Sequence, residues 1–137
     1  MVCSGKLFQK DEDSYSVVFE DDGRVAYAYL LNPSGSIVAD VWLYNCCYTP
    51  VEPEWKDPKN MPFINPQAYV NESEHDAFHA VDSISDVKID WCNDAENVKV
   101  RIYIRNKYFA SLDEGVAPGS SLFASKDGPL AKVLNSQ

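Results

Sequence analysis

The chain has 137 residues, 45% of them hydrophobic, and its 12 Lys and Arg against 21 Asp and Glu give a net charge of −9. A chain of this length is expected to form one hydrophobic core, and its apolar fraction excludes disorder over most of its length. A negative field repels nucleic acid and anionic lipid, and no apolar run approaches the roughly 20 residues that cross a bilayer, so we expect neither nucleic acid nor membrane as a partner.

The amino-terminal residues and the cysteines indicate the compartment. Residues 1–14 lack the apolar run of a signal peptide, which predicts a cytoplasmic protein. The four cysteines form no CxxC pair and show no metal-ligand spacing, so we expect them to be reduced thiols. They are Cys3, Cys46, Cys47 and Cys92.

Residues 14–45 have the pattern of a three-stranded antiparallel meander. Polar and apolar residues alternate with period two, and Asp22-Gly23 and Pro33-Ser34 predict the two turns. Pairing Phe19 with Ala26 and Leu30 with Ile37 gives the sheet one apolar face, which a one-residue slip would destroy. That face carries Tyr15, Val17, Phe19, Ala26, Ala28, Leu30, Ile37, Ala39, Val41 and Leu43.

The opposite face of this meander is rich in aromatic residues. It brings together Tyr27, Tyr29, Trp42 and Tyr44, which are residue types favoured at interfaces and sugar sites. We therefore predict these four residues as a binding surface. The alternative is that the following segment or the helix after it covers them as a second core layer.

Residues 46–70 form a proline-rich excursion. Prolines remove ladder donors, so this stretch predicts a long irregular loop, and its aromatic residues favour a loop folded onto the sheet. The prolines are Pro50, Pro53, Pro58, Pro62 and Pro66, and the aromatic residues between them include Trp55, Phe63 and Tyr69.

A short helix is predicted over residues 72–82, with Ser73 as its cap. It would carry His75 and His79 on one face, in a pattern that resembles the HExxH of zinc metalloproteases with Asp in place of Glu. No third ligand stands at a recognised distance, so we predict no metal and no cofactor. Without a metal, the two residues would be exposed histidines on an acidic helix.

The last part of the chain, residues 86–134, holds a second hairpin and a tail. Strands are predicted over 87–91 and 98–104, with Asn106-Lys107 turning the chain into a strand over 108–112. Arg101, Tyr103 and Arg105, flanked by Lys99 and Lys107, form a basic stripe suited to a carboxylate, a phosphate or an acidic partner segment.

Cross-strand ion pairs are the alternative for this stripe. We place Asp90 opposite Lys99 and Asp86 opposite Tyr103, which would occupy part of its charge. In the tail, Pro129 favours a short helix over Leu130–Leu134.

Together these elements predict a mainly β fold in one domain, residues 1–137. The hairpins favour an antiparallel β-sandwich or a strongly curled sheet, with one or two short helices. No glycine-rich nucleotide loop and no GxSxG motif occur. We therefore expect a non-enzymatic protein-interaction module, similar in profile to a cytosolic inhibitor or immunity protein, with a basic protein or a second copy of itself as partner.

Two other functions stay open. The first is binding of a small molecule or carbohydrate through Tyr27, Tyr29, Trp42 and Tyr44. The second is a metal-dependent hydrolase that uses His75 and His79.

Overall fold

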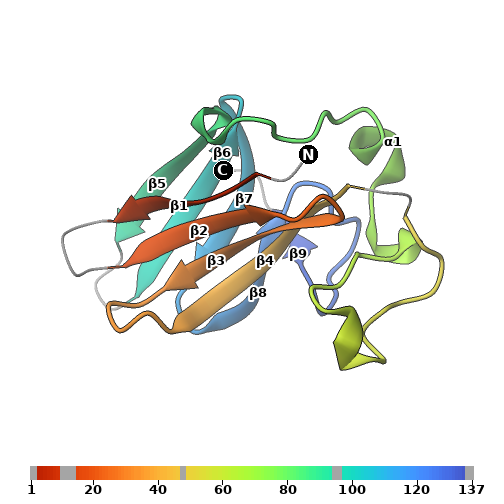
Figure 1. Cartoon of the computed structure of the whole chain (residues 1–137), viewed down its shortest axis with the longest axis horizontal. Helices are drawn as coiled ribbons and strands as arrows, with labels where there is room; N and C mark the ends of the chain where they lie inside the picture. Colours follow the sequence, from red (N-terminus) through yellow and green to blue (C-terminus); the bar gives the residue numbers. More distant parts are fainter. Residues whose placement is uncertain (1–2, 10–14, 47–48, 94–96, 135–137) are drawn as a thin grey trace.

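The computed structural model describes residues 3–9, 15–46, 49–93 and 97–134. It has a four-stranded sheet in the order β1-β2-β3-β4 and a five-stranded sheet in the order β5-β6-β7-β8-β9 (Figure 1). The strands of the first sheet are β1 (Cys3–Gln9), β2 (Ser16–Asp21), β3 (Val25–Leu31) and β4 (Ile37–Asn45). Those of the second are β5 (Val87–Asn93), β6 (Val98–Ile104), β7 (Lys107–Asp113), β8 (Val116–Ser121) and β9 (Lys132–Val133). The predicted mainly β fold is confirmed, and the two sheets are arranged as a sandwich.

In the described part of the segment that connects β4 to β5, the helices are all short. They are the 3₁₀ turns η1 (Pro58–Asn60), η2 (Gln67–Tyr69) and η3 (Ile84–Asp86) and the α-helix α1 (Glu72–His75). Within the described part of the chain, no helix has the length and apolar character to cross a membrane.

The sequence predicted the strands of the meander but not those at the ends of the chain. β1, which extends the meander beyond β2, and β8 were not predicted. The predicted helix over Leu130–Leu134 is wrong, since β9 lies there and pairs in parallel with β8. The Asp127 carboxylate accepts the backbone N–H of Val133 at 2.9 Å, which holds this segment extended.

Both predicted hairpin registers of the meander are wrong by two residues. Phe19 pairs with Ala28, and Leu30 pairs with Ala39. In the first turn Asp22 precedes the loop, and its carboxylate accepts the N–H groups of Arg24 and Val25 at 2.8 and 2.9 Å. A shift of two residues keeps every side chain on its own side of a sheet, so most of the apolar face is preserved although its pairs differ. Ile37 is the exception: it pairs with Leu31 beyond a bulge and is 61% exposed, so its predicted place on that face is wrong.

A β-bulge in β4 corrects the prediction for Tyr44. Ala26 pairs with Tyr44 while the next residue, Tyr27, pairs with Trp42, so Leu43 is an extra residue on β4. An extra residue reverses the alternation of sides beyond it. Tyr44 therefore lies on the side of Ala26 and faces the second sheet, and its predicted place on the aromatic face is wrong.

The two sheets share one core. Phe19, Leu30, Phe109 and Leu112 are fully buried in it. A methyl group added at Gly119 on β8 would lie 2.2 Å from the Ser111 carbonyl oxygen and 3.1 Å from Cβ of Val41 on β4. The close approach of β4 to β8 therefore depends on a residue without a side chain.

The predicted helix over 72–82 is only one turn long, and Asn71 rather than Ser73 precedes it. In a helix over 72–82 the Val81 N–H would donate to the Ala77 carbonyl oxygen, but it donates instead to the Tyr44 hydroxyl at 3.1 Å. Arg105 also donates to the carbonyl oxygens of His79 and Ala80 at 2.7 and 3.1 Å. The competing hydrogen bonds hold residues 78–83 in an irregular conformation.

Candidate functional site

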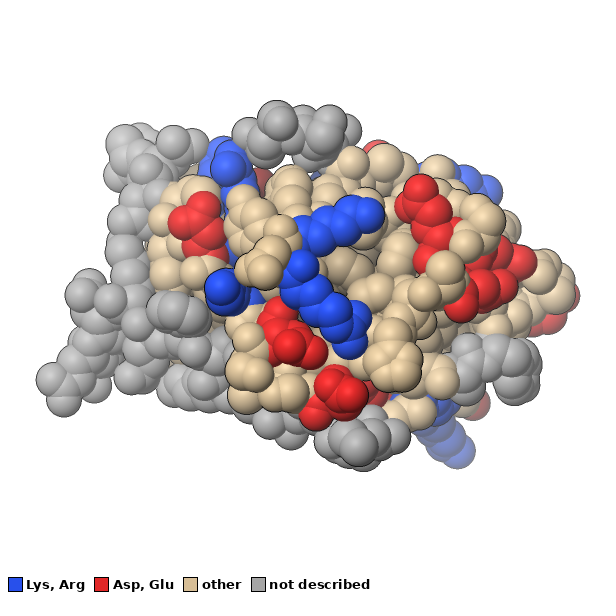
Figure 2. Space-filling view, turned by 90° about the horizontal axis from the view of Figure 1, so that it is seen from above, with Lys and Arg blue, Asp and Glu red and all other residues tan. Residues whose placement is uncertain are grey.

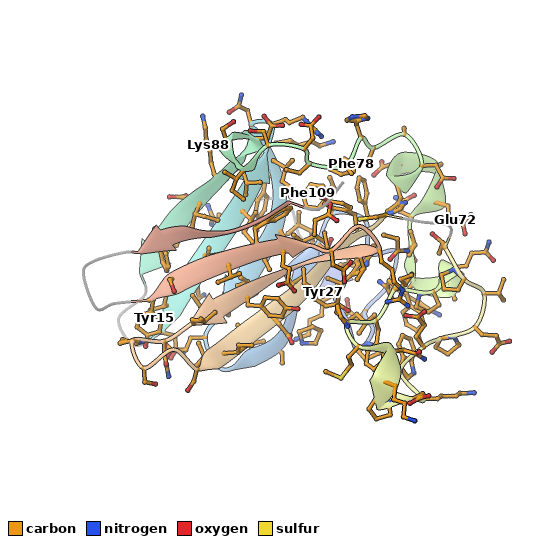
Figure 3. The ribbon with its side chains drawn as sticks, in the orientation of Figure 1. Tyr15, Tyr27, Glu72, Phe78, Lys88 and Phe109 are labelled. Atoms are coloured by element: carbon orange, nitrogen blue, oxygen red, sulfur yellow. The ribbon has the colours of Figure 1, made fainter. Side chains whose placement is uncertain are left out.

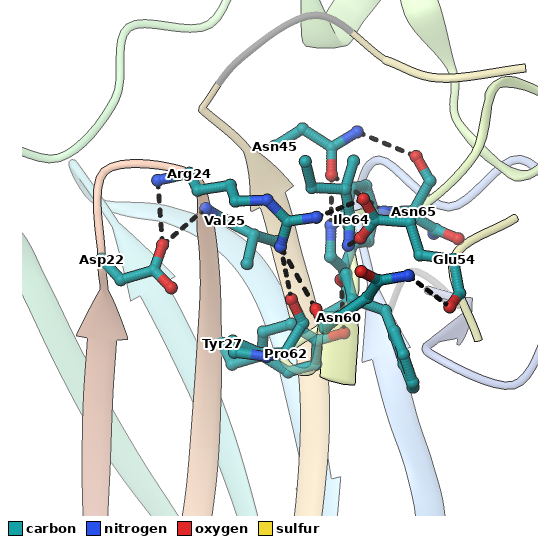
Figure 4. Close-up of polar contacts among 12 residues, drawn as sticks. Asp22, Arg24, Val25, Tyr27, Asn45, Glu54, Asn60, Pro62, Ile64 and Asn65 are labelled. Carbon is teal, nitrogen blue, oxygen red and sulfur yellow. Dashed lines mark hydrogen bonds and ion pairs between the residues drawn. The ribbon is translucent and has the colours of Figure 1, made fainter. Parts of the chain in front are cut away.

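The proline-rich segment is bound to the end of the first sheet by the Arg24 side chain (Figure 4). Arg24 forms an ion pair with Glu54 and donates to the carbonyl oxygen of Pro62 at 2.9 Å. The second carboxylate oxygen of Glu54 accepts the N–H of Ile64 at 2.8 Å. The prediction that this segment folds onto the sheet is confirmed for its described part, residues 49–70.

Asn45, at the end of β4, joins this segment to the sheet and to α1. Its side chain donates to the Asn65 carbonyl oxygen at 2.9 Å and accepts the Asn65 N–H at 3.0 Å. Its backbone N–H donates to Nε2 of His75 at 2.9 Å. The proline-rich segment and α1 thus both cover the end of the meander at which the aromatic residues lie.

Two of the four predicted aromatic binding residues, Trp42 and Tyr27, are buried under this cover. Trp42 is fully buried, lies parallel to the His75 ring at 6.1 Å and donates its indole N–H to Asn45 Oδ1 at 2.8 Å. Tyr27 is buried and donates its hydroxyl to the Phe63 carbonyl oxygen at 2.7 Å. Tyr29, stacked on Tyr27 at 6.0 Å, is half-buried. The arrangement is that of a second core layer, which leaves Tyr29 alone among the four with a partly accessible ring.

Tyr44 lies in the core between the sheets. Its hydroxyl donates to Asp21 Oδ2 at 2.8 Å and accepts the Val81 N–H at 3.1 Å. Its ring packs on Phe78 at a centroid distance of 4.9 Å. Burial raises the pKa of Tyr44, and it raises the pKa of Tyr29 to about 12, so both phenols stay protonated at neutral pH.

The two histidines are not arranged as the predicted pair. His75 is buried and its Nε2 accepts the Asn45 N–H, whereas His79 is exposed and lies beyond the end of α1. Burial lowers the pKa of His75, which favours the neutral ring with its proton on Nδ1. Among residues 3–9, 15–46, 49–93 and 97–134, no group of three or more His, Cys, Asp or Glu side chains has the geometry to hold a metal ion.

The basic stripe lies on the outer face of the second sheet, with a corrected register. The turn is Arg105-Asn106 rather than Asn106-Lys107, and both residues have positive φ. On the other edge of β6, Asp90 of β5 pairs with Arg101, and Lys88 pairs with Tyr103. The predicted pairings of Asp90 with Lys99 and of Asp86 with Tyr103 are wrong, again by two residues.

This register brings a tyrosine that was not predicted into the stripe. Tyr103 pairs with Tyr108 on β7, with the ring centroids 5.6 Å apart. The guanidinium carbon of Arg101 lies 5.9 Å from the centre of the Tyr108 ring. We call this surface the outer tyrosine face; it comprises Lys99, Arg101, Tyr103, Tyr108, Ser111 and Ser120.

A shallow cavity of about 240 Å³ lies on the outer tyrosine face, with Lys99, Arg101 and Tyr108 among the residues that line it. All members of the face are half-buried, which restricts their side chains. The strands β5 and β6 carry three basic residues and one acidic residue. The basic residues are Lys88, Lys99 and Arg101, and the acidic residue is Asp90.

Arg105 has a different environment from the one predicted. Besides its two carbonyl partners, its Nε lies 3.6 Å from Asp86 Oδ2 and its guanidinium group lies 5.3 Å from the centre of the Phe78 ring. These contacts attach the segment that follows α1 to the turn between β6 and β7. Arg105 is therefore a positioning residue for this segment.

An apolar pocket beside Arg105 was not predicted. It has a volume of about 400 Å³, and its residues are Glu74, Ala77, Phe78, Ile104, Arg105, Lys107, Phe109, Leu122 and Phe123. The labelled side chains of Phe78 and Phe109 lie at the same end of the sandwich in Figure 3. No local motif joins its three phenylalanines, since they come from three distant parts of the chain. We call this cavity the phenylalanine pocket.

Comparisons with protein-family models, with curated proteins and with solved structures found no match to the chain.

Proposed function

We propose that the protein is a non-enzymatic interaction module that binds an acidic segment of a partner protein through the outer tyrosine face. The observation that supports this proposal is the cluster of Arg101, Tyr103 and Tyr108 on the side of the second sheet that points away from the core. Tyr and Arg are the residue types that most often dominate the binding energy of protein interfaces.

The packing of these side chains favours binding. Side chains that are already restrained lose less conformational entropy when a partner orders them. The rings of Tyr103 and Tyr108 lie against each other, and the guanidinium group of Arg101 lies near the second ring. A guanidinium group presents paired donors that match a carboxylate, so an acidic segment fits this surface better than a basic one.

The acidic residues of the same strands set the strength of the interaction. Asp90 is the cross-strand neighbour of Arg101, and Asp113 is that of Lys99. A partner carboxylate competes with these groups for the same cations. We therefore expect modest affinity that falls as salt is added, because exposed charges are screened by ions.

A titration with a fluorescent peptide tests this proposal. The probe is a fluorescein-labelled peptide of alternating Glu and Tyr, and fluorescence anisotropy reports its binding to the wild type, to Arg101→Gln and to Lys59→Gln. Lys59→Gln removes the same charge from the exposed η1 turn of the proline-rich segment and serves as the control. We expect Arg101→Gln to weaken binding by about ten-fold, as for a charge-assisted hydrogen bond, and the control to leave it unchanged.

Two results would contradict the proposal. One is equal affinity of the peptide for the two variants. The other is tighter binding of a peptide with Lys in place of every Glu, which would assign the surface to a basic partner.

A further inference from the structure

The phenylalanine pocket has a wall of aromatic rings. Phe109 and Phe123 have centroids 5.1 Å apart, and both lie within 5.3 Å of the Phe78 ring. Ile104 and Leu122 complete the apolar surface. With a volume of about 400 Å³, the pocket lies in the range that small organic ligands occupy.

The basic residues at the rim of the pocket differ in the contacts that they already make within the protein. The Arg105 guanidinium group is held by the carbonyl oxygens of His79 and Ala80 and by Asp86. Lys107 lines the same pocket and is exposed, and the described residues provide it with neither a hydrogen bond nor an ion pair. Glu74 lines the pocket from the side of α1.

The view from above shows how this region of the surface is charged. Lys and Arg side chains gather in the middle of this face with some Asp and Glu beside them, and a further group of Asp and Glu lies on the side of α1 (Figure 2). Among the charged residues that line the pocket, Lys107 attracts an anionic group and Glu74 repels it.

We propose that the phenylalanine pocket binds a small amphiphilic carboxylate, with its apolar body against the partly exposed Phe78 and Leu122 and its carboxylate at Lys107. The buried rings of Phe109 and Phe123 form the base beneath them. An inorganic anion would bury no apolar surface there, and an organic cation would meet Arg105 and Lys107. This ligand is distinct from the acidic peptide proposed for the outer tyrosine face, and the two sites are tested by different variants.

Matched acid and alcohol probes separate the charge contribution from the apolar one. We propose to titrate ¹⁵N-labelled protein with 4-phenylbutyrate and with 4-phenylbutanol and to follow the amide signals by NMR. For probes of this size we expect dissociation constants of about 1–10 mM. The amides of Phe78, Phe109 and Phe123 should shift with both probes, and the acid should bind about two- to five-fold more tightly than the alcohol, as expected for an exposed ion pair.

Variants at the rim complete the test. Lys107→Gln should remove the advantage of the acid and leave the affinity for the alcohol unchanged, while Lys59→Gln should change neither. Ala77 is exposed at the pocket, so Ala77→Trp should obstruct it and weaken both probes, with Ala77→Ser as the matched control.

Three results would overturn the inference. These are shifts confined to residues outside the pocket, equal affinity for acid and alcohol in the wild type, and a Lys107→Gln variant that retains the preference for the acid. Loss of peptide binding in Arg101→Gln does not bear on this test, because Arg101 does not line the phenylalanine pocket.

Discussion

Replacing Trp42 by Ala distinguishes a core layer from a binding face. Trp42 is fully buried, and an aromatic side chain of this kind removes about 150–250 Å² from water. At about 25 cal/mol per Å², this area corresponds to about 4–6 kcal/mol as an upper value. Its indole N–H also donates to Asn45 Oδ1, which retains the Asn65 N–H as a second donor when Trp42 is removed.

We therefore expect Trp42→Ala to reduce the free energy of unfolding by about 3–5 kcal/mol, the range measured for buried aromatic residues. Urea denaturation followed by far-ultraviolet circular dichroism measures this change. The melting temperature should fall by about 10–20 °C in a chain of this size. Trp42→Phe retains a ring above His75 and should recover more than half of the loss.

Sedimentation velocity of the same variants tests the alternative. The account predicts that Trp42→Ala leaves the oligomeric state unchanged under conditions in which the variant is folded. A variant with near wild-type stability and weakened self-association would refute the burial argument and return Trp42 to an interface.

Three further predictions concern residues that position segments against the two sheets. Since burial lowers the pKa of His75 below its ordinary value of 6.5, the unfolded state binds this proton more tightly, and stability should fall as the pH drops below 6.5. Urea midpoints between pH 7.5 and about 5 should show this slope in the wild type and in His79→Gln, and a smaller slope in His75→Gln. Arg105→Lys cannot donate to two carbonyl groups from one planar fork, so it should destabilise the protein by about 1–2 kcal/mol and increase amide hydrogen exchange at Val81; unchanged exchange would contradict the positioning role. Gly119→Ala should cost more than about 2 kcal/mol, because its methyl group would overlap the Ser111 carbonyl oxygen, and a variant as stable as the wild type would show that β8 can move away from β4.

The side of the sheet that a residue faces was predicted better than the residue with which it pairs on the neighbouring strand. All three tested hairpin registers are wrong by two residues, yet the apolar face of the meander is correct except at Ile37, because period two is insensitive to an even shift. The bulge at Leu43 could not be predicted in this way, since nothing in the alternation of β4 marks the extra residue. It alone moved Tyr44 from the predicted aromatic face into the core.

The proposed sites depend on contacts between distant parts of the chain to different degrees. Arg101 and Tyr103 could be placed on one outer face because both lie on a single alternating strand. The predicted turn at Asn106-Lys107 would already have placed Tyr108 on this face, opposite Arg105. The turn at Arg105-Asn106, where two non-glycine residues adopt positive φ, places it opposite Tyr103 instead. The phenylalanine pocket depends on tertiary packing alone, so no local pattern indicates it.

Mapping the peptide site by NMR tests the central claim most directly. The ¹⁵N-labelled protein is titrated with the unlabelled Glu-Tyr peptide, first at low salt and then with added sodium chloride. The account predicts amide shifts concentrated on β6 and β7 around Arg101, Tyr103 and Tyr108, which diminish as salt is added. Shifts concentrated on the meander around Tyr29, or no shifts at concentrations well above those used for anisotropy, would contradict it.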